Sequence, residues 1–87
     1  MTYTVYILYS NKDRNLYVGC TNNIEKRLKR HYNGEVPATR HRLPVLLIHT
    51  KQFEIKSDAF NRERFLKSLW GAREKKKILQ AYLEKQG

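Results

Sequence analysis

Residues 3–20 read YTVYILYSNKDRNLYVGC, and this stretch decides the fold. Aromatic and β-branched side chains fill residues 3–9, which is the composition of a strand. The polar run 10–15 predicts a turn, and residues 16–20 predict a second strand that returns along the first. The stretch therefore predicts a β-hairpin as the first unit of the fold.

The hairpin carries two tyrosines and a glycine that bear on function. If Tyr6 and Tyr17 lie opposite each other, both phenols project from the same face of the sheet. Aromatic residues in strands are usually packing groups, so the pair by itself indicates only a shared face. Gly19 follows in the second strand, where a glycine indicates a bulge or a close approach of another group to the backbone.

A first helix is expected after the hairpin. Asn22 can cap its start, and Glu25 three residues later completes a pattern similar to a capping box. Ile24, Leu28 and Tyr32 recur at helical spacing, so they predict the side of this helix that is buried.

Five basic residues share this helix. Arg27 and His31 are four residues apart, so they lie on one face of the helix, at the border of the apolar stripe. Side chains at this border can line a groove. Lys26, Lys29 and Arg30 point outward. A solvated surface accounts for these three, although the same side chains could contact phosphates.

The second half of the chain predicts one strand and two helices. The apolar run 45–50 predicts a third strand that is covered on both faces. Ser57 is expected to cap a helix that runs to about Trp70 and is broken by Gly71. A last helix is expected from about Arg73. The order β-β-α-β-α-α predicts an α/β fold with a small antiparallel sheet and three helices.

Glu63 is the most informative residue of the second helix. On a helical wheel it falls within the apolar arc that Ala59, Leu66 and Trp70 form. A carboxylate that faces the core must be paired or bound to a metal. Lys67, four residues later, is the partner that the spacing favours, and a metal ion is the alternative.

The charge of the chain predicts a polyanionic partner. Its 87 residues are enough for one domain, expected over 1–87, and they include 18 Lys and Arg against 8 Asp and Glu. The net charge of +10 favours nucleic acid, because basic side chains that neutralise phosphates release counterions. An anionic membrane surface is the less favoured partner. The basic loop 35–43 contains Arg40 and Arg42.

Several classes of site and location are not expected. Cys20 is the only cysteine, so no intrachain disulfide can form, and the scattered histidines lack the spacing of a zinc site. The N-terminus has no basic start and only a short apolar run, unlike a signal peptide. No segment approaches the ~20 apolar residues of a membrane span. These observations predict a cytoplasmic protein with no membrane partner.

The order of these motifs resembles the GIY-YIG nuclease superfamily, and in particular its short standalone bacterial members. The resemblance rests on residues 4–8 (TVYIL), residues 17–19 (YVG), Arg27 and His31 on the next helix, and Glu63 on a later helix. It covers nearly the whole chain. This sequence departs from the family pattern in having Thr4, Val5 and Val18 within the signature and no Asn after Asn61.

The resemblance implies a three-stranded antiparallel sheet flanked by helices, and hydrolysis of a phosphodiester with one divalent metal ion, Mg²⁺ or Mn²⁺. It implies that Glu63 binds the metal. It also implies that Arg27, the two signature tyrosines Tyr6 and Tyr17, and His31 complete the active site. A phenol can act as a base only if cations lower its pKa from about 10.

The function expected from sequence is therefore a metal-dependent endonuclease that cleaves single- or double-stranded DNA with little sequence specificity, in DNA repair or recombination. The alternatives are a nucleic-acid-binding module with weak or no turnover, and an adaptor that docks an acidic protein. No obligate protein partner is evident. The candidate nucleic-acid contacts are Gly19, Lys26, Lys29, Arg30, Arg40, Arg42 and Lys67.

Overall fold

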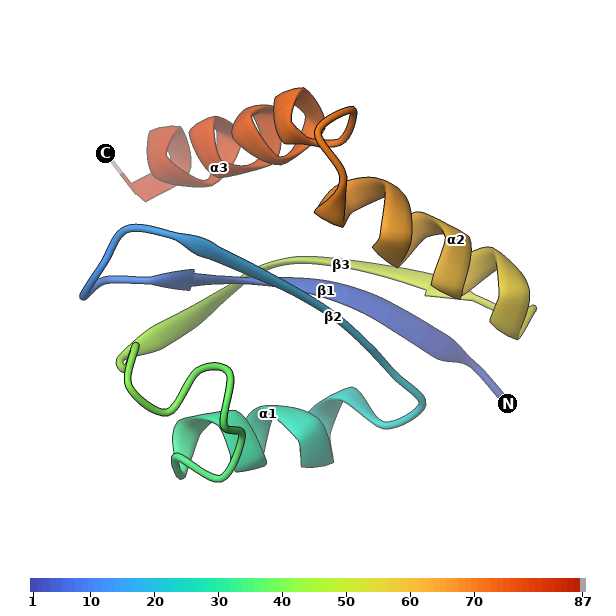
Figure 1. Ribbon diagram of the computed structural model, residues 1–87, viewed down its shortest axis with the longest axis horizontal. Helices are drawn as coiled ribbons and strands as arrows, with labels where there is room; N and C mark the ends of the chain where they lie inside the picture. The colour runs from blue at the N-terminus through green and yellow to red at the C-terminus, as the bar shows by residue number, and fades with distance from the viewer. Residues whose placement is uncertain (87) are drawn as a thin grey trace.

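The predicted hairpin is present, and the rest of the chain is built around it (Figure 1). The computed structural model describes residues 1–86, so Gly87, the last residue of the expected domain, lies outside the described residues. The predicted order of elements is confirmed: β1 (Tyr3–Ser10), β2 (Leu16–Thr21), α1 (Ile24–Tyr32), β3 (Val45–Phe53), α2 (Lys56–Lys67) and α3 (Ala72–Gln86).

The three strands form an antiparallel sheet in the order β2-β1-β3, with helices on both faces. Figure 1 shows α1 on one face of the sheet and α2 and α3 on the other. The side chains of the central strand β1 alternate between these layers. Val5 and Ile7 pack with Leu66 of α2, whereas Tyr6 and Leu8 pack on the α1 side. The predicted fold class, a small antiparallel sheet flanked by three helices, is confirmed.

The third strand differs from its prediction in length and in surroundings. β3 extends beyond residue 50 to Phe53, and it is an edge strand. Val45 is buried, but Leu46 is 38% exposed and Thr50 is exposed. The expectation of a strand covered on both faces is therefore wrong for β3. It describes β1 instead, because an apolar run reveals burial propensity but not the order of strands in the sheet.

The register of the hairpin also differs from the expected one. Tyr6 pairs with Gly19, and Leu8 pairs with Tyr17, so the two tyrosines are not directly opposite each other. The difference of two residues leaves every side chain on the same face of the sheet, because strands alternate with a period of two. The predicted shared face of Tyr6 and Tyr17 is thus confirmed, in a diagonal arrangement.

Helix α1 begins one residue later than expected and buries a different side chain. Asn23, not Asn22, is its N-cap, and its side-chain oxygen accepts a hydrogen bond from the Lys26 backbone N–H at 3.1 Å. His31 is fully buried, whereas Tyr32 is exposed. The buried side of the helix is therefore centred closer to His31 than the apolar stripe predicted.

Helix α2 is shorter than predicted. Ser57 lies inside its first turn, and Ile55 is the N-cap without a side-chain hydrogen bond. The helix ends at Lys67, so Trp70 leaves the predicted apolar arc and is 85% exposed. Gly71 allows this ending, because a Cβ there would overlap the backbone of the preceding helix.

Helix α3 begins at Ala72, next to the expected start, and packs against α2 and β3. An ion pair joins the two helices, with Arg62 Nη2 of α2 at 3.4 Å from Glu74 Oε1 of α3. Among the residues that the structure describes, no helix is both long enough and apolar enough to cross a membrane.

Candidate active site

Three aromatic rings meet between the sheet and α1. The ring centroids of Tyr6 and Tyr17 are 6.2 Å apart, and those of Tyr17 and His31 are 5.2 Å apart. Tyr6 and His31 lie edge to face with centroids separated by 5.6 Å. The structure therefore brings together both signature tyrosines and the histidine that the sequence predicted at the site.

The hydroxyl of Tyr6 connects the two candidate site residues of α1, Arg27 and His31. Arg27 Nε donates a hydrogen bond to Tyr6 Oη at 3.3 Å, and the same hydroxyl lies 2.9 Å from His31 Nε2. Hydrogen bonding to Tyr6 raises the pKa of the Arg27 guanidinium, and hydrogen bonding to Tyr17 adds to this effect. Arg27 is thus fixed as a permanent positive charge beside two phenols.

The imidazole of His31 is neutral and held from both sides. Burial, followed by the charges of Arg27 and Arg30, lowers its pKa to about 4. Its Nδ1 lies 2.8 Å from Thr39 Oγ1 in the loop before β3. Because Arg27 donates to Tyr6, the Tyr6 hydroxyl can donate to Nε2, and the proton on Nδ1 can then go to Thr39. The two nitrogens therefore have complementary partners.

Thr39 is a site residue that the sequence did not reveal. It is fully buried in the segment between α1 and β3, although its neighbours Ala38 and Arg40 are exposed. The segment has no periodicity, and its basic residues indicate only a charged surface. No signal in the sequence marks Thr39, because its role depends on how the loop folds back onto His31.

The phenol of Tyr6 does not have the lowered pKa that a general base requires. Burial raises the pKa of Tyr6 to about 12, and the opposing effect of the Arg27 hydrogen bond is smaller. Tyr6 is fully buried, whereas Tyr17 is only partly buried. Tyr6 is therefore a neutral hydrogen-bonding group at neutral pH, and Tyr17 is the phenol that can face solvent.

Gly19 gives the Tyr6 ring its space. A Cβ at Gly19 would overlap the end of that ring, including the carbon that carries the hydroxyl. The ring cannot move aside freely, because Arg27 and His31 hold its oxygen. Of the two readings of this glycine, the close approach of another group is confirmed.

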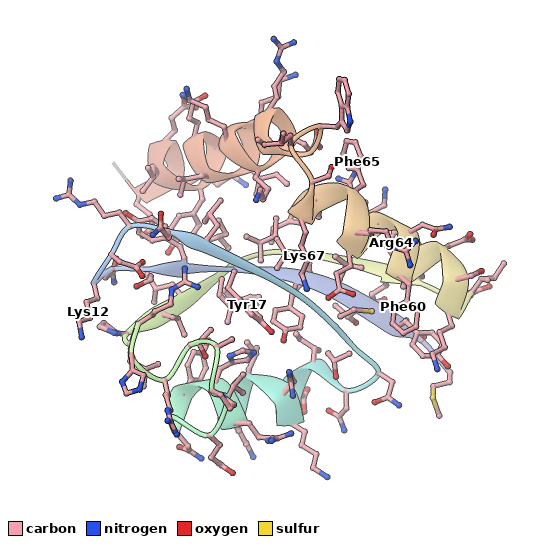
Figure 2. All side chains as sticks on the ribbon, in the orientation of Figure 1. Lys12, Tyr17, Phe60, Arg64, Phe65 and Lys67 are labelled. Carbon is pink, nitrogen blue, oxygen red and sulfur yellow. The ribbon has the colours of Figure 1, made fainter. Side chains whose placement is uncertain are left out.

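Glu63 lies on the other side of β2 from this cluster. Its Oε2 is 2.9 Å from Lys67 Nζ, which confirms the helical ion pair that the spacing favoured. Glu63 is 22% exposed, and its charge helps burial to raise the pKa of the Cys20 thiol on β2. In Figure 2, Lys67 and Tyr17 appear on opposite sides of this edge strand. Among residues 1–86, no hydrogen bond joins Glu63 to the tyrosines or to Arg27.

The carboxylate of Glu63 suits a hard cation. Mg²⁺ is commonly bound by one or two carboxylates together with waters and substrate phosphates, and it does not need a cage of protein ligands. No group of three or more His, Cys, Asp or Glu side chains that could hold a metal occurs within the described residues. A single partly buried carboxylate therefore fits an ion shared with a substrate and does not fit a structural metal.

The predicted phosphate contacts fall into two groups. Lys26 and Arg30 line a recess next to Arg27, and Lys29 is exposed on α1. Arg40 and Arg42 lie in the loop before β3. Arg40 Nε donates to His41, whereas Arg42 forms an ion pair with Asp13 across 2.9 Å.

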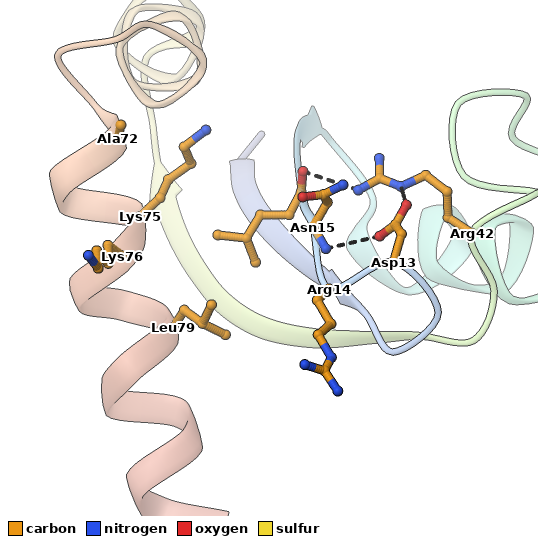
Figure 3. Close-up of a pocket in the computed structure, with 9 residues that line it drawn as sticks. Asp13, Arg14, Asn15, Arg42, Ala72, Lys75, Lys76 and Leu79 are labelled. Atoms are coloured by element: carbon orange, nitrogen blue, oxygen red, sulfur yellow. Dashed lines mark hydrogen bonds and ion pairs between the residues drawn. The ribbon is translucent and has the colours of Figure 1, made fainter.

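A cavity lined by the hairpin tip and α3 is separate from the tyrosine cluster. It has a volume of about 700 Å³ and lies between the tip of the hairpin and α3. Figure 3 shows Arg42 and Asp13 on one side of it, with Lys75 and Leu79 of α3 on the other. Asp13 is held in place by the Asn15 backbone, which also lowers its pKa. The cavity adds basic surface, but it contains none of the signature residues.

The comparison with protein families identifies the family of this chain. Residues 2–77 match the model of the GIY-YIG catalytic domain. The chain belongs to the GIY-YIG family. Membership implies a nuclease-type function, and the matched region contains all five residues of the predicted catalytic set.

Relatives within the family carry names that state no activity. The chain is 44% identical over 75 residues to a UPF0213 protein of Natronomonas pharaonis, covering 85% of this chain and 87% of the relative. It is 50% identical over 66 residues to a UPF0213 protein of Clostridium perfringens, covering 75% and 70% respectively. The resemblance to small standalone members of the GIY-YIG family is thus confirmed.

A solved structure shows the same fold. The solution NMR structure of a UPF0213 protein from Bacillus halodurans matches with a TM-score of 0.56 and 32% sequence identity. The match covers 93% of this chain and 85% of the other.

Proposed function

We propose that this GIY-YIG protein is a metal-dependent endonuclease that hydrolyses phosphodiester bonds in single- or double-stranded DNA with little sequence specificity. The observation that carries the proposal is the hydrogen bond from Arg27 to the Tyr6 hydroxyl, next to the ring of Tyr17 and to a buried, neutral His31. A role in DNA repair or recombination is part of the proposal.

Arg27 is the group that stabilises the negative charge that develops on the phosphate. Its Nε is occupied by Tyr6 at 3.3 Å, which fixes the direction of the guanidinium. Arg27 has no carboxylate partner within residues 1–86, so its terminal nitrogens can be directed at phosphate oxygens. Such a preorganised donor acts without reorganisation during the reaction, and two nitrogens can bind two oxygens in a way that lysine cannot copy.

The two tyrosines have different tasks. Tyr6 is buried and neutral, so it positions Arg27 through its hydroxyl and does not take the proton of the attacking water. Tyr17 is partly exposed beside the same guanidinium, and we assign to it the orientation of that water. His31 and Thr39 hold Tyr6 in place through their hydrogen bonds.

Glu63 is the proposed ligand of one Mg²⁺ or Mn²⁺ ion, which when bound supplies Lewis-acid stabilisation of the phosphate oxygens. Glu63 must release Lys67 for this purpose, because the ammonium lies 2.9 Å from its carboxylate oxygen. Lys67 is then free to contact a phosphate of the substrate. This exchange links the binding of substrate to the release of Glu63 from its ion pair with Lys67.

The basic residues around the site bind the DNA backbone. The net charge of +10 provides attraction to phosphate regardless of sequence. Contacts to phosphate position a strand without reading its bases, which agrees with low sequence specificity. We assign these contacts to Lys26, Lys29, Arg30, Arg40 and Arg42.

A second candidate function is a nucleic-acid-binding module without turnover. The Lys67–Glu63 ion pair favours it, because an ammonium already neutralises the carboxylate that would bind the metal. The chain also has no Asn after Asn61. This candidate predicts salt-sensitive binding to nucleic acid but no cleavage that depends on a metal.

A cleavage assay separates the two functions. The purified chain is incubated with single-stranded DNA, duplex DNA and RNA in Mg²⁺, Mn²⁺ or chelator. We expect cleavage of DNA with either metal, none in chelator, and at least a 100-fold loss of rate in Arg27→Ala and Glu63→Ala. The exposed residues Arg64 and Glu54 provide matched controls, and their Ala variants should cleave like the wild type. Binding without cleavage in every condition would support the second candidate.

A further inference from the structure

Two recesses meet where β2 ends, next to the candidate active site. The first, called here the basic recess, has a volume of about 180 Å³ and is lined by Lys26, Arg27 and Arg30. The second, called the aromatic recess, has a volume of about 310 Å³ and lies on the α2 side of the sheet. Both are lined by Thr21 and Asn22, so they form one continuous surface around the end of the strand.

The basic recess has the chemistry of a phosphate site. Among residues 1–86, Lys26 and Arg30 form no ion pair, so their charges are available to a ligand. Arg27 lines the same recess and also donates to the Tyr6 hydroxyl. A phosphate bound here would therefore lie within reach of the guanidinium that we assign to catalysis.

The aromatic recess has the chemistry of a site for a nucleobase. Tyr3 and Phe60 line it, and Phe60 is 42% exposed. Lys56 Nζ lies 5.4 Å from the centroid of the Phe60 ring and adds positive charge to the rim. Aromatic faces beside positive charge are the usual platform on which bases of nucleic acids stack.

Asn22 supplies a polar group at the junction of the two recesses. The only hydrogen bond described for its side-chain amide is a long contact of 3.6 Å from Nδ2 to Met1 Sδ. The amide therefore has both a donor and an acceptor to offer. This combination matches the edge of adenine, which an Asn side chain can pair through two hydrogen bonds.

We propose that the two recesses together bind one nucleotide of the substrate, with its phosphate in the basic recess and its base between Tyr3 and Phe60. This inference rests on the proposed function, because it places the phosphate beside Arg27. The base contacts α2 close to Glu63, whose charge acts on Cys20 in the wall of the aromatic recess. The site thus spans both sides of β2, as the candidate catalytic residues do.

The chain contains an internal control for this assignment. Phe65 lies on the same helix as Phe60, is 40% exposed, and also faces a cation, with Arg62 Cζ 5.6 Å from its ring centroid. Figure 2 shows Phe65 above α2, next to the turn into α3, and Phe60 below the helix. Phe65 lines neither recess. The two phenylalanines differ in position but not in exposure or local chemistry.

The test compares two small ligands that differ only in the base. Chemical shifts of the full chain are followed by NMR during titration with 2′-deoxyadenosine 5′-monophosphate and with 2-deoxyribose 5-phosphate, in chelator. We expect both ligands to shift the signals of Lys26, Arg27 and Arg30. Only the nucleotide should shift the ring signals of Tyr3 and Phe60, and it should bind about tenfold more tightly because its base stacks.

Three variants decide whether the recesses hold the nucleotide as proposed. Phe60→Ala should reduce nucleotide affinity to that of the sugar phosphate, and Phe65→Ala should leave it unchanged. Asn22→Ala, which alters an exposed side chain, should weaken nucleotide binding without affecting the sugar phosphate. Equal affinity of the two ligands, or equal losses in Phe60→Ala and Phe65→Ala, would overturn the proposal. Because no step of this test requires cleavage, its failure is distinguishable from failure of the nuclease function.

Discussion

Tyr6 joins Arg27, the arginine that we assign to catalysis, to the buried His31 through a single hydroxyl. Removing that oxygen in Tyr6→Phe leaves His31 Nε2 without its partner at 2.9 Å and frees the Arg27 side chain. We expect cleavage to fall by about 100-fold, because a small misplacement of a catalytic group has effects of that size. The free energy of unfolding should fall by about 1–2 kcal/mol.

The control for this variant is Tyr9→Phe on the same strand. The Tyr9 hydroxyl forms no hydrogen bond within the described residues, so its removal should change neither rate nor stability by a comparable amount. Rates come from single-turnover cleavage and stabilities from chemical denaturation. Equal rates for Tyr6→Phe and the wild type would remove Tyr6 from the active site.

His31 makes the stability of the fold depend on pH. Its pKa is lowered to about 4 in the folded protein, against 6.5 for an ordinary histidine, so the unfolded chain takes up the proton first. Stability is therefore complete above about pH 6.5 and decreases as the pH falls toward 4. The separation of the two pKa values corresponds to at most about 3 kcal/mol.

Urea denaturation across this pH range measures the effect. The dependence should be clearly weaker in His31→Gln, which cannot take up a proton, than in the wild type. His41→Gln changes an exposed histidine and should keep the wild-type dependence. If His31→Gln and the wild type lose stability in parallel, the histidine is not the source of the pH effect.

Among the single residues, the sequence predicted that the two tyrosines, Arg27 and His31 share one site, but it did not predict how they interact or that Glu63 lies apart from them. The spacing of Arg27 and His31 placed both on one helical face, and the alternation of the strands placed the two tyrosines together. The burial of His31 and its contact with Thr39 could not be predicted, because they depend on how an irregular loop closes.

Among the elements, the β1–β2 hairpin depends on Gly19 for its close packing around the Tyr6 ring. Gly19→Ala introduces a Cβ that overlaps the Tyr6 ring, while Arg27 and His31 restrain the ring from moving. Overpacking of this kind typically costs about 1–3 kcal/mol, and we also expect cleavage to fall with the displacement of Tyr6. Thermal denaturation and cleavage rates test both effects. Gln52→Ala, at an exposed position of β3, should retain the wild-type rate; a fully active Gly19→Ala would contradict the close packing.

On helix α2, the ammonium of Lys67 competes with a metal ion for the carboxylate of Glu63. In Lys67→Met the ammonium at 2.9 Å is removed, so the carboxylate should bind a divalent metal more tightly. We expect the metal concentration for half-maximal cleavage to decrease by several-fold. The free energy of unfolding should change by less than about 0.5 kcal/mol, because helical ion pairs contribute little. Metal titrations of cleavage measure the shift, and an increase in the metal requirement would show that Lys67 does not compete for Glu63.

The type and order of the elements were predictable, but several of their ends were not. Periodic side chains located each helix, whereas Asn22 and Asn23 are equally suitable caps by composition, and only the second accepts the hydrogen bond from Lys26. The end of α2 before Trp70 follows from the packing of Gly71 against the helix backbone. Such tertiary contacts have no signature in local sequence.

For the molecule as a whole, the three layers distribute the candidate catalytic residues over two faces of one sheet. Tyr6, Tyr17 and Arg27 lie on the α1 side of β2, and Glu63 lies on the α2 side. Because β2 is an edge strand, a substrate that wraps around its edge can touch both sides. The central claim is therefore that Arg27 and Glu63, which have no described contact with each other, belong to one active site.

A double-mutant cycle on cleavage tests that claim most directly. The value of kcat/KM is measured for the wild type, Arg27→Ala, Glu63→Ala and the double variant with the same DNA and metal. Residues that act as a unit show strongly non-additive effects. Our account predicts that each single variant loses at least about 100-fold and that the double variant is about as slow as the slower single variant. Losses that multiply in the double variant, or a Glu63→Ala variant with the wild-type rate, would contradict it.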